Sequence, residues 1–324
     1  MNKYLWKRIK YLLIGITGCL LVLIAWSFIE PYSLDRKVVV AEVPSLPQSW
    51  QGKQIAVIAD FQIGMWLANT NTVQQAIRQI VIDRPAVALI AGDFVYKPGS
   101  NLTPELNQVI ELVRPLVDAK IPTYAVLGNH DYGVKKITEP DGGGQQRANQ
   151  IEQALEAIGI PVLQNEAIVL PNEDPVATED FYLVGIGAYL PKQSQPLRAI
   201  AQVPDQAARF VLMHNPASFA ELPAGTAPVA VAGHTHGGQI QIPFMPDWSW
   251  MTLVEDKPSW AWLSQIRGDI VRVSGWIPGY GNAENRLYIN RGIGFSHLPI
   301  RFNCRPELTM FTLRAKAAPT NTVA

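Results

Sequence analysis

The N-terminal part of the chain contains one long apolar run. Residues 11–29 carry no charge, and basic residues precede them at Lys3, Lys7, Arg8 and Lys10. As a helix this run spans roughly 28 Å, about the hydrocarbon thickness of a bilayer. We therefore predict a transmembrane signal anchor at residues 1–30. Residues 31–53 should follow as an extended linker, because Pro44 and Pro47 disfavour a helix there.

A cleaved signal peptide is the alternative interpretation of the apolar run. Such a peptide usually has a shorter apolar region and a small-residue cleavage site. Here the run ends in Trp26 and Phe28, and aromatic residues suit a membrane interface. The basic N-terminal flank favours a single-pass protein of the bacterial inner membrane with its domain outside the cytoplasm. Arg36 and Lys37, which follow the run, count against that orientation.

From residue 54 onward, buried runs alternate with amphipathic segments. Apolar runs predict strands at 54–59, 87–91 and 123–127, and helical spacing predicts helices at 70–83 and 103–119. This alternation predicts a mainly parallel sheet, whose ligands lie beyond the carboxyl ends of its strands. A polar residue follows each of the three strands, namely Asp60, Asp93 and Asn129.

The second half of the domain is richer in β-sequence. After a helix at about 145–158, strands are expected near 162–163, 167–170, 181–186, 209–213, 287–290 and 308–313, which closes a domain at 54–314. Residues 243–283 hold five tryptophans and are expected to form an insert, and residues 315–324 a disordered tail.

Two histidines separated by one residue lie between glycines in this second half. His234 and His236 follow the apolar run 228–232, which reads as a buried strand. Alternate residues of an extended segment point the same way, so both histidines can face one site, such as a metal. The alternative is a pair of surface histidines in a loop.

The overall charge and the cysteines narrow the classes of function. Basic and acidic residues number 27 each, so the formal net charge is +0 and a basic excess typical of nucleic-acid binders is absent. Cys19 lies in the apolar run and Cys304 near the C-terminus, which makes them poor disulfide partners.

The polar residues at the strand ends carry the candidate chemistry. Seven of them are potential ligands: Asp60, Asp93, Asn129, His130, His214, His234 and His236. Asp and His together suit ions such as Mn²⁺, Fe²⁺ or Zn²⁺. Seven ligands are too many for one catalytic ion with open positions and suit two ions that share a carboxylate. Such a pair clamps the attacking and leaving oxygens of a phosphoryl displacement.

Five motifs in order along the chain point to a known family. They are Asp60-Phe61-Gln62, Gly92-Asp93, Gly128-Asn129-His130-Asp131, His214 and Gly233-His234-Thr235-His236. With these motifs, residues 54–313 resemble the calcineurin-like metallophosphoesterase superfamily. Glu30-Pro31-Tyr32, the Gly-Gly-Gln after the histidines and Pro299-Ile300-Arg301-Phe302 resemble its membrane-associated bacterial phosphodiesterase branch.

The resemblance implies both a fold and a set of roles. The fold is an α/β architecture of two β-sheets packed as a sandwich, with helices on both outer faces. Asp60, Gln62 and His236 would hold the first metal ion, Asn129, His214 and His234 the second, and Asp93 would bridge both. His130 would protonate the leaving oxygen, held in place by Asp131.

One position departs from the family pattern. The family usually has histidine where this chain has Gln62, which offers a neutral amide oxygen in place of an imidazole nitrogen. We expect a metal-dependent phosphodiesterase or pyrophosphatase that uses two divalent ions, with Mn²⁺ favoured, on a phosphoester substrate that is lipid-linked or belongs to the envelope. The alternative, which Gln62 favours, is a catalytically weak metal-binding envelope protein derived from this family.

Overall fold

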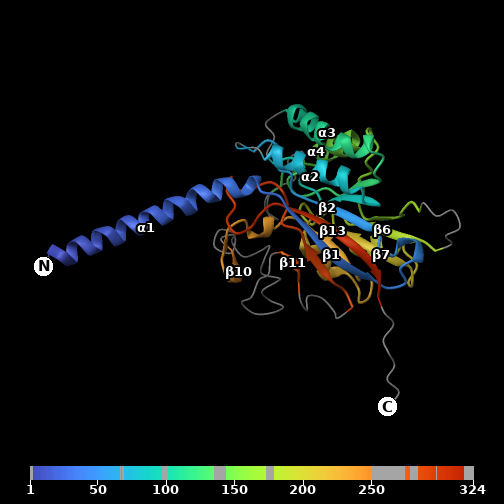
Figure 1. Ribbon diagram of the computed structural model, residues 1–324. Coiled ribbons are helices and arrows are strands. Elements are labelled where there is room, and N and C mark those ends of the chain that lie inside the picture. The colour runs from blue at the N-terminus through green and yellow to red at the C-terminus, as the bar shows by residue number, and fades with distance from the viewer. Residues whose placement is uncertain are drawn as a thin grey trace, which may run out of the picture.

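Two β-sheets pack face to face, and helices cover their outer faces (Figure 1). The computed structural model describes residues 3–65, 67, 69–96, 101–134, 144–172, 179–249, 274–277, 284–296 and 298–316, without the side chains of 245–249. This is the two-sheet α/β sandwich with an N-terminal apolar helix that the sequence predicts.

The first sheet has the strand order β1-β13-β2-β3-β4. Its strands are β1 (Asp35–Val43), β2 (Gln54–Ile58), β3 (Val87–Ile90), β4 (Thr123–Ala125) and β13 (Glu307–Ala315). β2, β3 and β4 are parallel, whereas β13 is antiparallel to β2 and parallel to β1. The helices α2 (Thr70–Asp83), α3 (Thr103–Asp118) and α4 (Gly144–Glu156) pack their apolar residues on its outer face.

The second sheet has the strand order β11-β12-β8-β7-β6-β5. Its strands are β5 (Glu166–Val169), β6 (Phe181–Gly185), β7 (Ala208–Leu212), β8 (Ala230–Ala232), β11 (Gly275–Trp276) and β12 (Leu287–Ile289). The central four are parallel, and both edge strands are antiparallel to their neighbours. The helix α5 (Pro196–Ile200) and the 3-10 helix η3 (Pro216–Glu221) cover its outer face.

The core between the sheets explains why the strands read as continuous apolar runs. Ile55 and Val57 of β2 face Phe210 of β7 and Val231 of β8 across a fully buried layer. Phe311 of β13 meets Phe210 edge-on, with ring centroids 5.6 Å apart. Because helices also cover the outer faces, both sides of these strands are buried and polar alternation is lost.

The N-terminal helix α1 (Lys3–Ile29) extends away from the domain (Figure 1). Its length and its exposed apolar side chains suit a membrane span, and a signal sequence near an N-terminus meets the same description. The 3-10 helix η1 (Glu30–Tyr32) joins α1 to the domain.

The segment 31–53, expected to be a linker, contains a strand instead. β1 pairs with β13 over its whole length, from Asp35 opposite Glu307 to Val43 opposite Ala315. Pro44 and Pro47 lie after this strand, so they do not interrupt it, and a further 3-10 helix, η2 (Gln48–Trp50), follows. The segment is therefore part of the first sheet.

Most of the tryptophan-rich segment 243–283 lies outside the described residues, which include only 243–249, with β10 (Met245–Ser249), and 274–277, with β11. β10 pairs with the short strand β9 (Gln241–Ile242). Of the expected tail, Ala315 is still in β13, and residues 317–324 lie outside the described residues.

Candidate metal centre

The strand-end residues of both sheets meet at one place. Asp60 follows β2, Asp93 follows β3, Asn129 follows β4, His214 follows β7, and His234 and His236 follow β8. The backbone at Asp60 and Asp93 has φ of 54° and 59°, in the left-handed region that non-glycine residues seldom adopt. Such strain is common at functional sites, where the surrounding structure enforces it.

Glycines allow these loops to approach one another closely. A side chain at Gly128 would collide with the Asp93 carboxylate and would lie 2.7 Å from a carbon of the His214 ring. A side chain at Gly233 would lie 2.9 Å from a carboxylate oxygen of Asp60. The glycines in the sequence motifs are therefore needed for the close packing of the candidate ligands.

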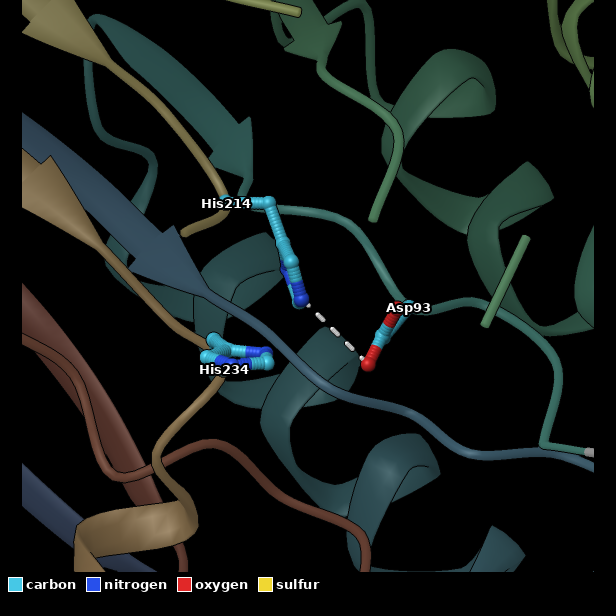
Figure 2. A group of neighbouring side chains, drawn as sticks. All are labelled: Asp93, His214 and His234. Atoms are coloured by element: carbon cyan, nitrogen blue, oxygen red, sulfur yellow. Dashed lines mark ion pairs between the residues drawn. The ribbon is translucent and has the colours of Figure 1, made fainter. Parts of the chain in front are cut away.

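One group of side chains forms around Asp93, His214 and His234 (Figure 2), with one potential ligand atom from each within 4.8 Å of the others. His214 Nε2 lies 3.3 Å from Asp93 Oδ2 and 3.1 Å from the side-chain oxygen of Asn129. The rings of His214 and His234 meet edge-on at 5.1 Å. Two strand ends of the first sheet and two of the second thus contribute to this group.

The orientation of His214 suits a metal ligand. Its Nδ1 lies 2.7 Å from the Ala91 carbonyl oxygen, so Nδ1 carries an N–H and Nε2 is the ring atom that could bind a cation. Burial alone lowers the pKa of His214, but the adjacent Asp93 carboxylate outweighs it and raises the pKa to about 9. Burial and the neighbouring His214 charge lower the pKa of His234 to about 3, so His234 is neutral at ordinary pH.

A second group consists of Asp60, Asp93 and His236, again with ligand atoms within 4.8 Å of one another. His236 Nε2 lies 3.8 Å from Asp60 Oδ1. Gln62 lies between Asp93 and His236. Its Nε2 donates a hydrogen bond to Asp93 Oδ2 at 2.8 Å and lies 3.5 Å from His236 Nε2. The two groups share Asp93.

The side chains present fit two divalent cations. Within the described part of the chain, the buried Gln62 Oε1 and His236 Nδ1 have no hydrogen-bond partner. Burial, with a smaller contribution from the Asp93 carboxylate, raises the pKa of Asp60 to about 7. Two buried carboxylates without a bound cation are costly, and a divalent ion removes that cost.

His130 lies beside the two groups, and Tyr96 contacts its ring. Its backbone N–H donates to Asp93 Oδ1 at 2.8 Å, its Nδ1 lies 2.7 Å from the Tyr96 carbonyl oxygen, and its ring stacks on that of Tyr96 with centroids 5.1 Å apart. Asp131, which the sequence predicts to hold His130 in place, contacts the backbone of the loops after β3 and β4. Both Asp131 oxygens accept backbone N–H groups, from Gly128, Asp93, Phe94 and Val95. Asp131 therefore fixes the loops that carry Asp93 and His130.

Two residues of the centre were missed by the sequence analysis. Tyr96, three positions after Asp93, has no motif to reveal it. Arg301 belongs to the Pro299-Ile300-Arg301-Phe302 motif, but the sequence indicates no role for it. Its buried guanidinium donates to the backbone oxygen of His236 at 3.3 Å, and its charge is among the causes that lower the pKa of His236.

The chain is similar to several known proteins. The family model described as calcineurin-like phosphoesterase matches residues 53–299. Phosphodiesterase YaeI of Escherichia coli (strain K12) is 29% identical over 80% of this chain and 82% of its own length. UDP-2,3-diacylglucosamine pyrophosphatase LpxG of Chlamydia trachomatis is 22% identical over 92% and 97%. A solved dimetal phosphatase of Danio rerio aligns at 11% identity and a TM-score of 0.40, over 81% of this chain and 99% of its own.

Proposed function

Because the chain belongs to the calcineurin-like phosphoesterase family and is a phosphoester hydrolase, we propose that it is a dimetal phosphodiesterase or pyrophosphatase. The observation that carries this proposal is the pair of buried donor groups that share Asp93. A shared carboxylate is the usual means of holding two ions close enough to act on one phosphate.

The ligands are assigned from these two groups. Asn129, His214 and His234 would hold one ion, Asp60, His236 and Gln62 the other, and Asp93 would contact both. When bound, the ions supply Lewis-acid activation of water and neutralise charge on the phosphate oxygens. The carboxylate and amide oxygens among the ligands favour Mn²⁺ over softer ions.

His130 is the proposed proton donor to the leaving oxygen. The Tyr96 carbonyl at Nδ1 fixes the ring so that Nε2 is the atom that holds and releases the proton. The hydrogen bond from the His130 backbone to Asp93 keeps the ring beside the two ligand groups.

A lipid-linked phosphoester is the substrate class that we propose. LpxG is named for a diacylated pyrophosphate, and YaeI is named as a phosphodiesterase. The apolar helix α1 would keep the centre close to a bilayer. A matched pair of substrates tests this idea: a diacylated pyrophosphate in micelles and its deacylated counterpart. The diacylated compound should have a kcat/KM at least tenfold higher. Equal values would contradict a lipid-linked substrate.

For the localisation, we propose an uncleaved anchor in the bacterial inner membrane with the domain outside the cytoplasm. Cleavage at the end of α1 would remove Ser27, which is buried against the domain. An alkaline phosphatase fused at Ala324 should be active, and a fluorescent protein fused there should be dark. The reverse pattern would place the centre in the cytoplasm.

The second candidate function is a catalytically weak metal-binding envelope protein. The hydrogen bond from the Gln62 amide to Asp93 favours it, since an N–H donor there occupies the position of a ligand. Hydrolysis of bis(4-nitrophenyl) phosphate with added Mn²⁺, by the wild type and by Asp93→Asn, separates the two. The enzyme proposal predicts turnover that falls by about 10² or more in the variant, the scale of losing an electrostatic catalytic group. If the wild type binds Mn²⁺ but is no faster than the variant, the second candidate is supported.

A further inference from the structure

Glu30, at the end of the N-terminal helix, is buried in the domain, with 3% of its surface exposed. Its carboxylate accepts hydrogen bonds from Trp26 Nε1 at 2.8 Å and from the backbone N–H groups of Asn303 at 2.9 Å and Cys304 at 2.5 Å. A buried carboxylate needs such donors to compensate for its lost hydration. The end of α1 is therefore fastened to residues 303–304.

Two further hydrogen bonds fix the same junction. The carbonyl oxygen of Ser27 accepts from the backbone N–H of Arg301 at 3.0 Å, and the Pro31 carbonyl accepts from Thr72 Oγ1 in α2 at 3.1 Å. Two of the three motifs that suggest the membrane-associated branch, Glu30-Pro31-Tyr32 and Pro299-Ile300-Arg301-Phe302, thus lie close to each other. The helix joins the domain through a packed contact, without a free linker.

Residues 301–304 hold the loop that carries His236. The buried guanidinium of Arg301 donates to the His236 carbonyl at 3.3 Å, and also to the carbonyls of Gly292 at 3.3 Å and Gly294 at 2.6 Å. The Cys304 thiol lies 3.4 Å from the His236 carbonyl oxygen and 3.2 Å from that of Gly237.

Contacts of the same kind extend to the Asp60 side of the centre. The backbone N–H of Gly294 donates to the Asp60 carbonyl at 2.6 Å, and a side chain at Gly292 would lie 2.5 Å from an Asp60 carboxylate oxygen. Arg301 therefore joins the His236 loop to the segment packed on Asp60. His236 itself has φ of 48°, a conformation that its surroundings must enforce.

We propose that the membrane-side junction, residues 26–31, is a positioning element for the metal-centre loop 236–238, acting through Glu30, Cys304 and Arg301. The N-terminal helix then has a role in the centre beyond attachment: its end sets the place of His236 relative to Asp60. This inference uses the ligand assignment of the proposed function, whereas the contacts that carry it are hydrogen bonds between protein groups.

Hydrogen exchange of the full-length protein in detergent micelles with EDTA tests this proposal. Glu30→Gln replaces one of the carboxylate oxygens that accept the backbone N–H groups of 303–304 by an amide N–H₂. Trp26→Phe removes the indole donor but keeps an aromatic ring. The control is Glu42→Gln, which changes an exposed carboxylate of β1 that contacts Arg286 at 3.4 Å.

Amides of Gly238 and Gln239, which bond to the carbonyls of Thr235 and His236, should exchange about tenfold faster in Glu30→Gln. Trp26→Phe should give a smaller change in the same segment, and Glu42→Gln none. Amides of β7 and β8 should keep the wild-type rate in all three. Unchanged exchange at 236–241 in both junction variants would overturn the proposal, and so would a uniform rise that includes β7 and β8. If Glu30→Gln does not fold, Trp26→Phe decides.

A Mn²⁺ titration of the same proteins gives a second readout. The ion on the Asp60 and His236 side should bind about tenfold more weakly in Glu30→Gln, whereas the ion on the His214 side should change less than twofold. Equal weakening of both would contradict a local positioning role. Absence of Mn²⁺ binding by the wild type would refute the proposed function and leave the exchange result to decide the positioning role.

Discussion

At the scale of single residues, His130 and Gln62 decide what the centre can do. His130→Ala should lower turnover about 10²–10⁴-fold, the usual effect of losing a general acid. Metal content should stay near wild type, because the contact of residue 130 with Asp93 is made by its backbone N–H. Steady-state kinetics with metal analysis measures both. Loss of bound ions from the variant would show that His130 is a ligand.

Gln62→His should strengthen the ion site on the Asp60 side. The Gln62 amide N–H₂ donates to Asp93, and the buried amide oxygen has no partner in the described part of the chain. The side-chain amide must therefore flip before its oxygen can bind a cation beside Asp93. Histidine supplies a nitrogen ligand at the same position. The variant should retain a second ion through dialysis and reach half-maximal activity at about tenfold lower Mn²⁺, a gain of ~1.4 kcal/mol.

Gln62→Ala is the matched control, since it removes the amide without adding a ligand and should not lower the Mn²⁺ requirement. Equal metal content and equal Mn²⁺ dependence in wild type and Gln62→His would show that position 62 does not affect the ion.

The sequence indicates which polar residues meet at the strand ends but not which groups support them. Asp60, Asp93, Asn129 and His214 each follow an apolar run, and parallel strands bring such positions to one edge. The roles of Asp131 and Arg301 depend instead on contacts with backbone groups of distant loops. A backbone N–H or carbonyl carries no residue identity, so the sequence does not reveal such partners.

At the scale of elements, β1 is the strand that makes the N-terminal segment part of the domain. Ala41→Asp would place a carboxylate between the sheets, where Ala41 is fully buried. Without a partner such a group costs several kcal/mol, so the free energy of unfolding should fall by roughly 2–4 kcal/mol. Urea unfolding of the detergent-solubilised chain measures this.

Val38→Glu on the same strand is the control. Val38 is 55% exposed, so its substitution should change the free energy of unfolding by no more than about 0.5 kcal/mol. If Ala41→Asp lowered the free energy of unfolding no more than Val38→Glu, β1 would be a peripheral linker, as the prolines alone suggest.

Helices with a strong apolar periodicity are predicted accurately from the sequence, whereas the strand β1 is not. The expected helices at 70–83 and 103–119 correspond to α2 and α3, because each has a clear apolar face. Among the described strands β1 pairs only with β13, near the other end of the chain, and no local sequence pattern indicates that pairing. The prolines at 44 and 47 mark its end and obscured the strand before them.

At the scale of the whole molecule, the protonation of the centre makes the free energy of unfolding depend on pH when no metal is bound. In the folded protein the Asp93 carboxylate, against the effect of burial, raises the pKa of His214 to about 9, from the ordinary 6.5 expected of the unfolded chain. The folded state thus holds an extra proton between these values. The stability this contributes is complete below pH 6.5 and is lost as pH rises through about 9.

The melting temperature of the EDTA-treated protein should therefore fall between pH 8 and pH 9.5. Asp60 and Asp131, both with pKa raised to about 7 chiefly by burial, lose their protons before this window opens. In His214→Gln the fall should be smaller. An identical pH profile in wild type and variant would mean that His214 does not hold that proton. Added Mn²⁺ should reverse the trend, since it binds the deprotonated ring.

The most direct test of the dimetal assignment is anomalous scattering from crystals of the protein grown with Mn²⁺. The account predicts two peaks on either side of Asp93, one bonded to Asn129, His214 and His234 and the other to Asp60 and His236. Each peak should lie within direct coordination distance of these side-chain nitrogen and oxygen atoms. Absence of any peak at Asp93, or an ion held by other residues, would contradict the central claim.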